Sequence, residues 1–186
     1  MSFADRLDVN VIPGGLPSVG RNAGAHRATT PYVLFIDADM ELKDPTLLRR
    51  SVNLAKRRKL HCLTTNIWCS NGRLRDQVLY IGNNVAQYGS MLVRPFSTGM
   101  FMLFDRNKFE QLGGFNEGAL YAEDYLLSKK VANWRFRVVR GCIHTTNRRF
   151  RSMGYFKIIR MFVKTMFNTW NEDYFLRDHG YWRQKV

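Results

Sequence analysis

The chain has 186 residues, a length that supports one domain with a real hydrophobic core but not two comfortable ones. Its apolar and aromatic content is that of a folded protein, which excludes a disordered chain. With 29 Lys and Arg against 15 Asp and Glu, the net charge is +14, which attracts nucleic acid, anionic lipid headgroups or phosphorylated small molecules.

The elements alternate between strand and helix patterns. In the first half of the chain we expect a strand at 7–12, a loop at 13–20, a short helix at 21–29, a buried strand at 31–39 and a helix at 44–60. We then expect a strand at 61–69, a strand, turn and short helix at 99–115, a helix at 122–133, a strand at 135–144 and helices beyond it. Residues 70–95 are polar and rich in Gly and Asn, and they allow no assignment. This alternation predicts an α/β sheet that is at least partly parallel.

The cysteines and the chain start bear on the compartment. Cys62, Cys69 and Cys142 are odd in number and form no CxxC pair, so neither a disulfide framework nor a zinc site is indicated. Reduced thiols are typical of the cytosol. The sequence shows no signal-peptide pattern and no apolar run near the ~20 residues of a membrane-spanning helix. We therefore expect a cytoplasmic protein.

Two aspartates, Asp37 and Asp39, come where the apolar run YVLFI ends. Ligands of open α/β sheets bind at the carboxyl ends of strands, and residues i and i+2 of an extended segment point to the same side. Two such carboxylates form a hard oxygen site for Mg²⁺ or Mn²⁺, which would hold the phosphates of a nucleotide. The alternative is that they only cap the next helix, although Asp44 already stands at its start. The spacing alone leaves both interpretations open.

A second acidic pair, Glu123 and Asp124, stands where the helix at 122–133 begins. Acids in a first helical turn are usually there because they favour the helix dipole. The functional interpretation is a general base that deprotonates an acceptor hydroxyl. The residues alone favour the dipole interpretation.

Four stretches then stand in one order: GRNAGAHRATTPYVLFIDAD, STGMFMLFDRNKFEQLGGFNE, AEDYLL and IHTTNRRF. This order resembles the family 2 glycosyltransferases of the GT-A type over roughly residues 7–150. The resemblance implies a GT-A Rossmann-like mixed sheet, with a partial glycosyltransferase domain at 1–150 and an amphipathic, basic helical tail at 151–186. It implies metal-dependent, inverting transfer of a sugar from a nucleotide-diphosphate sugar to an acceptor hydroxyl, in cell-surface polysaccharide or glycolipid synthesis.

The resemblance also implies roles for individual residues. Asp39 would be the direct ligand of Mn²⁺ or Mg²⁺, Asp37 would lie closer to the sugar and ribose, and Asp124 would be the catalytic base with Glu123 beside it. The other implied residues are Arg21 and Asn22 on the nucleotide side, Ser97, Thr98 and Gly99 in an acceptor-side loop, His144 as a further metal or diphosphate ligand, and Arg148, Arg149 and Arg151 as a flexible basic segment that closes over a diphosphate. A lone histidine is more often structural, and the arginines equally fit a solvated charge run.

The chain departs from the family pattern at its start. The family opens with a strand–helix–strand unit that holds much of the nucleotide base, whereas this sequence begins at what looks like the third strand. Such a unit takes ~30 residues or more. A truncated gene model or fragment, a second polypeptide that supplies the unit, and a decayed, catalytically inactive enzyme all fit. The exposed sheet edge would favour a homo-oligomer or a partner chain.

The tail at 154–170 has apolar residues at the spacing of one helical face, with Lys157, Arg160 and Lys164 among the polar positions. The helix either packs on the domain, packs on a neighbouring subunit, or lies in a membrane interface attracted by anionic lipid. The last interpretation suits a lipid-linked acceptor and a peripheral position on the inner face of the membrane.

A nucleic-acid-binding protein is the competing class, prompted by the charge of +14. It predicts a basic stripe with aromatic stacking residues, whereas the basic residues here are scattered and no nucleic-acid motif is visible. We therefore expect a nucleotide-sugar donor and a glycan or lipid-linked acceptor as partners, and no nucleic acid.

Overall fold

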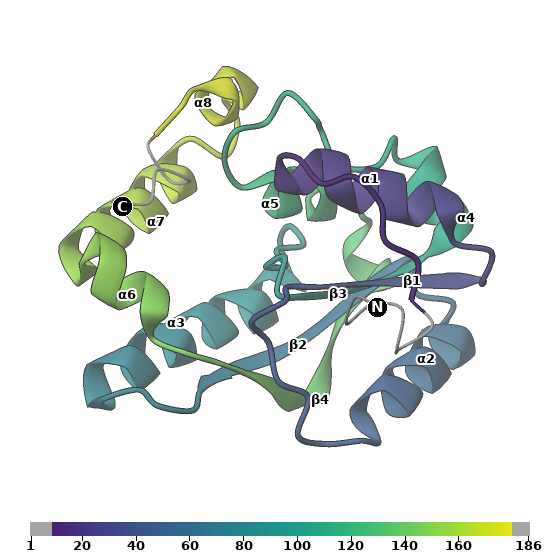
Figure 1. The fold of residues 1–186 in the computed structure, drawn as a ribbon, viewed down its shortest axis with the longest axis horizontal. Helices are drawn as coiled ribbons and strands as arrows, with labels where there is room; N and C mark the ends of the chain where they lie inside the picture. The colour runs from purple at the N-terminus through teal and green to yellow at the C-terminus, as the bar shows by residue number, and fades with distance from the viewer. Residues whose placement is uncertain (1–8, 180–186) are drawn as a thin grey trace.

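The computed structural model describes residues 9–179, which form a central sheet with helices on both faces (Figure 1). The strands are β1 (Tyr32–Ile36), β2 (Cys62–Cys69), β3 (Phe101–Asp105) and β4 (Phe136–Thr145), in the order β1-β3-β2-β4. β3 is antiparallel to both of its neighbours, and β2 is parallel to β4. The expected mixed α/β sheet is confirmed.

The helices divide between the two faces and one end of the sheet. They are α1 (Pro17–Arg27), α2 (Leu47–Arg58), α3 (Leu74–Ser90), α4 (Arg106–Gln111), α5 (Glu123–Ser128), α6 (Arg148–Met153), α7 (Tyr155–Phe167) and α8 (Glu172–Leu176), with a 3-10 turn at Asn133–Arg135. α1, α4 and α5 lie on one face and α2 and α3 on the other, while α6 to α8 gather at one end (Figure 1).

Each face of the sheet has its own core because strand side chains alternate between faces. Met102 and Phe104 of β3 pack with the α4 residue Phe109 on one face. The neighbouring strand residue Leu103 packs with Leu47 of α2 on the other face. The sheet is thereby fixed between two helix layers.

The strand β1 differs from the continuous buried strand that the sequence predicts. Val33 and Phe35 are buried, but Leu34 is only partly buried and Ile36 is 42% exposed. β1 is an edge strand of the sheet within residues 9–179, and only the face bearing Val33 and Phe35 is fully covered. The last residue of β1, Ile36, therefore leads directly into the segment that bears Asp37 and Asp39.

Other boundaries also differ from the sequence prediction. Residues 9–12 form no strand, and residues 7 and 8 of that predicted strand lie outside the described residues. The loop expected at 13–20 is wrong in its second half, because α1 already begins at Pro17, whose fixed φ suits a first helical turn. The helix expected over 122–133 ends earlier, at Ser128.

The helix α3 fills much of the stretch that allowed no assignment. Its buried residues are Asp76, Tyr80 and Gln87, so polar groups face the protein. Its apolar residues Leu74, Val78, Ile81 and Val85 are exposed. Their helical spacing was the signal that could have revealed it.

The tail helices were expected, and α6 to α8 confirm them. α6 crosses the proposed domain boundary at residue 150. Met161 of α7 and Phe175 of α8 pack against Tyr121, which precedes α5, and Tyr125, which lies in α5. Residues 180–186 of the tail lie outside the described residues. Within residues 9–179 no helix is both long and apolar enough to span a bilayer.

Candidate active site

One arginine joins acids from two distant segments above the carboxyl end of β1. Arg21, from α1, places Nη2 at 2.6 Å from Asp37 Oδ1 and Nη1 at 2.7 Å from Glu123 Oε1. The side chains of Arg21 and Glu123 are 15% and 7% exposed. Burying charges is tolerable only when they are paired in this way. We refer to Arg21, Asp37, Gly99, Glu123 and Asp124 as the Arg21 cluster.

Gly99 ties Asp124 into this cluster. The backbone N–H of Gly99 donates to Asp124 Oδ2 at 2.6 Å, and the N–H of Tyr125 donates to Asp124 Oδ1 at 2.7 Å. A Cβ added at Gly99 would lie 2.6 Å from Nη2 of Arg21. The group that comes close to Gly99 in the structure is therefore the Arg21 guanidinium.

The start of α5 is shaped to present the two acids. Ala122, the residue before Glu123, has φ 51° and ψ 39°, a left-handed conformation that is costly for a residue with a Cβ. Glu123 then turns to Arg21 and Asp124 to the Gly99 N–H. Because α5 is only six residues long and both acids have specific partners, a helix-dipole role alone does not account for them.

Burial shifts both acids toward their protonated forms. Burial, with the nearby Asp124 charge as a second cause, raises the pKa of Glu123 to about 7 against the opposing effect of Arg21. Burial likewise raises the pKa of Asp124, although Arg21 and the Gly99 hydrogen bond oppose the shift. A raised pKa makes a carboxylate a better proton acceptor near neutral pH.

The second aspartate of the pair, Asp39, has a different environment. Its Oδ2 lies 2.8 Å from Nη2 of Arg148, in the first turn of α6. The Arg148 side chain is 68% exposed and that of Asp39 is 39% exposed. The two aspartates thus contact two different arginines, one buried and one in solvent. We call this contact the Asp39–Arg148 pair.

A metal site can be tested against the oxygen ligands that these residues offer. Residues 9–179 contain no group of three or more His, Cys, Asp and Glu side chains arranged to hold a metal ion. Mg²⁺ is usually held by one or two carboxylates together with substrate phosphates. Asp37 and Asp39 fit that kind of site, which the ligand completes, and do not fit a preformed protein cage.

His144 is not brought to the aspartates. Its Nδ1 lies 3.2 Å from Ser70 Oγ and its Nε2 lies 3.4 Å from Cys142 Sγ. Burial, with Lys43 as a further cause, lowers the pKa of His144 and favours the neutral ring. Its backbone instead bridges to Glu41 in the segment that follows Asp39. The expected role as a third metal ligand finds no support in this geometry.

Asn22 also has a structural environment that differs from the expected nucleotide contact. Its Nδ2 donates to Phe115 O at 2.9 Å and to Glu117 Oε1 at 2.8 Å, and its Oδ1 accepts from Phe115 N at 2.9 Å. Both N–H groups of this amide donate, and its oxygen accepts one bond. Asn22 therefore fixes α1 to the loop after α4.

Ser97 and Thr98, in the loop before β3, differ in their hydrogen bonding. Ser97 is fully buried, and its N–H donates to Ser128 Oγ at 3.2 Å. The hydroxyl of Thr98, by contrast, is buried with no hydrogen-bond partner in the described part of the chain. Lying next to Gly99, Thr98 is the residue of this loop with an unused polar group.

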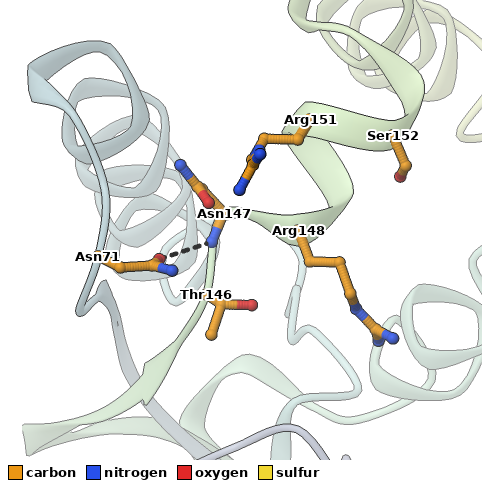
Figure 2. Close-up of a pocket in the computed structure, with 6 residues that line it drawn as sticks. All are labelled: Asn71, Thr146, Asn147, Arg148, Arg151 and Ser152. Carbon is orange, nitrogen blue, oxygen red and sulfur yellow. Dashed lines mark hydrogen bonds between the residues drawn. The ribbon is translucent and has the colours of Figure 1, made fainter.

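The basic segment forms a helix rather than a flexible loop, and it borders a cavity. The cavity has a volume of about 480 Å³ and is lined by Asn71, Thr146, Asn147, Arg148, Arg151 and Ser152 (Figure 2).

Arg149 is half-buried on α6, and its positive charge opposes the rise in pKa that burial causes at Tyr80 and Tyr121. A second cavity of about 360 Å³ shares Asn71, Asn147 and Arg151 and adds Arg73, Arg75 and Tyr155. Sequence reasoning missed Arg73 and Arg75 because their helix was not assigned.

Comparisons with protein families and solved structures show which proteins this chain is similar to. A model of the family described as glycosyl transferase family 2 matches residues 8–113, more than half of the chain. No curated protein sequence matches it.

Two solved structures resemble the fold. One is the mannosyltransferase PcManGT from Pyrobaculum calidifontis in complex with GDP-Man and Mn²⁺, with 19% identity, a TM-score of 0.54, and coverage of 80% of this chain and 43% of that one. The other is TarS from S. aureus, with 17% identity, a TM-score of 0.52, and coverage of 82% and 27%. At these identities the likeness shows the fold, and the expected GT-A sheet is confirmed. The chain spans less than half the length of either structure.

Proposed function

The chain belongs to glycosyl transferase family 2, and we propose that it transfers a sugar from a nucleotide-diphosphate sugar to an acceptor hydroxyl, with Asp124 as the base. The observation that carries this proposal is the Arg21 cluster. It holds one carboxylate with a raised pKa next to a second acid, at the carboxyl end of a strand where ligands of such sheets bind.

The proposed reaction is a direct displacement that inverts the anomeric carbon. The acceptor oxygen forms a bond to that carbon while the bond from the carbon to the diphosphate oxygen breaks. Asp124 accepts the acceptor proton, and the electron pair of the broken bond leaves with the nucleoside diphosphate. Arg21 orients the site by holding Asp37 and Glu123 on either side. Thr98, whose buried hydroxyl has no hydrogen-bond partner in the described part of the chain, would contact the acceptor.

Asp37 and Asp39 would hold Mn²⁺ or Mg²⁺ together with the donor phosphates. When bound, the ion neutralises charge on the departing diphosphate. Arg148 keeps Asp39 paired in the absence of ligand, and its exposed guanidinium can transfer to a phosphate oxygen when the donor enters. Arg149, on the same helix, would add to the positive potential around the diphosphate. PcManGT, whose structure contains GDP-Man and Mn²⁺, supports this choice of ligands.

The exposed apolar face of α7 supports a peripheral membrane location. Phe156, Phe162 and Met166 of α7 are exposed, at 79%, 47% and 74%. Lys157, Arg160 and Lys164 lie among them on the same helix. An exposed apolar face flanked by cations suits the interface of an anionic bilayer. We infer a lipid-linked or surface-glycan acceptor, in cell-surface polysaccharide or glycolipid synthesis.

The test is a thermal-shift panel of UDP, GDP, dTDP and CMP with and without Mn²⁺, on the wild type and on Asp39→Asn. We expect one nucleotide to raise the melting temperature only when Mn²⁺ is present, because the ion links the carboxylate to the phosphates. The substitution should abolish this rise. A folded wild type that responds to no nucleotide would refute a donor site on this chain.

A non-catalytic scaffold with the same fold is the second candidate. Both oxygens of Asp124 already accept backbone hydrogen bonds, which is the observation in its favour. Donor hydrolysis separates the two candidates, since many transferases slowly pass the sugar to water when no acceptor is present. Nucleotide release that stops in Asp124→Asn supports the transferase, and tight donor binding with no release in either protein supports the scaffold.

A further inference from the structure

Two adjoining cavities lie between α3 and α6. Arg148, which the proposed transfer reaction uses, lines the first, but no residue of that reaction lines the second. They share Asn71, Asn147 and Arg151, and the second is also lined by Arg73 and Arg75. Arg73 and Arg75 come from the start of α3, and Arg151 comes from α6. Three guanidinium groups from two helices therefore converge on one space. We call Arg73, Arg75 and Arg151 the arginine pocket.

The walls of the arginine pocket are held in place by their own contacts. The Arg75 guanidinium lies 4.3 Å from the centre of the Tyr155 ring, and that ring stacks on Phe150 at 5.6 Å. Asn71 Oδ1 accepts from the Asn147 N–H at 3.0 Å, which joins the loop before α3 to the loop before α6. Because the Arg75 guanidinium is positioned beforehand, this cation loses little freedom when an anion binds.

Charge in the pocket is strongly positive. One carboxylate bonds to the lining residues, that of Asp76, which is fully buried and accepts hydrogen bonds from the Tyr155 hydroxyl, the Asn147 amide and the Arg73 N–H. No hydrogen bond or ion pair within residues 9–179 engages the guanidinium of Arg151. The Asp76 carboxylate is thus engaged by neighbouring groups other than the three guanidinium groups, and Arg151 is available to a ligand. Planar guanidinium groups are the preferred partners of phosphate oxygens.

The arginine pocket adjoins the region expected for the donor phosphates but includes none of the residues that the proposed function assigns to them. Arg148 and Arg151 leave the same short helix in different directions: Arg151 extends toward Asn147 and Asn71, whereas Arg148 extends away from them (Figure 2). Arg148 instead pairs with Asp39. A ligand group held by Arg73, Arg75 and Arg151 would therefore leave the Asp39–Arg148 pair unoccupied.

We propose that the arginine pocket binds the phosphate or diphosphate of a second ligand, separate from the donor. If the proposed transfer function holds, on which this assignment of role rests, that ligand is the acceptor. The acceptor then belongs to the phosphorylated class, either a lipid-borne phosphate or a soluble phosphate ester. Binding by three arginines requires no divalent ion, which distinguishes it from the donor site at Asp39.

The test measures binding of inorganic pyrophosphate to the full chain by calorimetry, with EDTA present to remove divalent ions. We expect the double variant Arg73→Gln/Arg151→Gln to bind roughly tenfold more weakly than the wild type, or worse, because charge-assisted hydrogen bonds are lost. Both residues are exposed, so circular dichroism and melting should show an unchanged fold. The matched control is Arg57→Gln/Arg58→Gln on α2, which removes the same charge elsewhere and should bind as the wild type does.

Asp39→Asn shows which site the pyrophosphate occupies. Unchanged binding in Asp39→Asn supports the arginine pocket. Loss of binding in Asp39→Asn, or equal binding in the double variant and its control, would overturn the proposal. If the arginine variants lose pyrophosphate while the wild type shows no Mn²⁺-dependent nucleotide shift, the pocket stands and the proposed transfer function fails.

Sedimentation with phosphatidylcholine vesicles, with and without phosphatidic acid, distinguishes the two sources of phosphate. Binding that depends on phosphatidic acid and is lost in the arginine double variant supports a lipid-borne phosphate. Vesicle binding that is unchanged in that variant, together with weakened pyrophosphate binding, supports a soluble phosphate ester in the same pocket.

Discussion

The Arg21 cluster and the Asp39–Arg148 pair each join an arginine to an acid from a distant part of the chain, but at different depths. Arg21 and Glu123 are 15% and 7% exposed, whereas Arg148 and Asp39 are 68% and 39% exposed. Breaking a buried pair leaves an uncompensated charge, while an exposed pair contributes little to stability. The buried region therefore keeps one geometry, and the exposed region can exchange partners when a ligand arrives.

The substitution Arg21→Met tests the buried side most strongly. It should lower the free energy of unfolding by about 3–5 kcal/mol, because the Glu123 and Asp37 carboxylates lose their buried partner. Urea denaturation measures this loss. Arg148→Met is the matched control, and it should change the free energy of unfolding by no more than about 0.5 kcal/mol. Equal losses in the two variants would remove the contrast between the regions.

Gly99→Ala tests whether the Arg21 cluster tolerates added volume. The new Cβ would lie 2.6 Å from Arg21 Nη2, and two ion pairs prevent that guanidinium from moving away. We expect a loss of about 1–3 kcal/mol in the free energy of unfolding. The control is Gly82→Ala in α3, where nothing lies within 4 Å and Ala should add about 0.5–1 kcal/mol. The same sign in both variants would contradict the close approach at Gly99.

Glu123 predicts a pH dependence of stability. Its pKa is raised to about 7 in the folded protein from an ordinary value of 4.5, so the folded state holds the proton more tightly than the unfolded state. Its contribution is present below pH 4.5 and is lost as pH rises toward 7, by at most about 1.4 kcal/mol per pH unit. The free energy of unfolding of the wild type minus that of Glu123→Gln should fall over this window. A difference that stays flat or rises would show that Glu123 titrates normally.

Sequence reasoning was most successful where hydrophobic patterns decide the structure. The strands at 62–69, 101–105 and 136–145 and the helix at 47–58 were predicted, because their apolar spacing reflects the two cores directly. The order of motifs also placed Arg21 and Asp124 among the site residues, and the structure brings both into one cluster. α3 was missed because its buried face carries polar residues such as Asp76 and Gln87.

Side-chain partners could not be predicted from the sequence. Nothing local shows that the Asn22 amide bonds to Phe115 and Glu117, or that His144 lies beside Ser70. These contacts join residues that are far apart in the chain, so they depend on how the helices pack on the sheet. The arginine pocket is of the same kind, since its residues come from α3 and α6.

A double-mutant cycle on the Asp39–Arg148 pair should give the smallest effect and is the sharpest measure of the contrast. We expect Asp39→Asn and Arg148→Gln to show a coupling of at most about 0.2–1 kcal/mol, because both side chains are exposed and solvent screens their attraction. That coupling should vanish at high salt, whereas the coupling between Arg21 and Glu123 should persist because burial protects it from screening. A salt-resistant coupling between Asp39 and Arg148 would mean that Arg148 is fixed in place. It would then be unable to release Asp39 to a metal-bound phosphate, and the exchange of partners proposed for donor entry would fail.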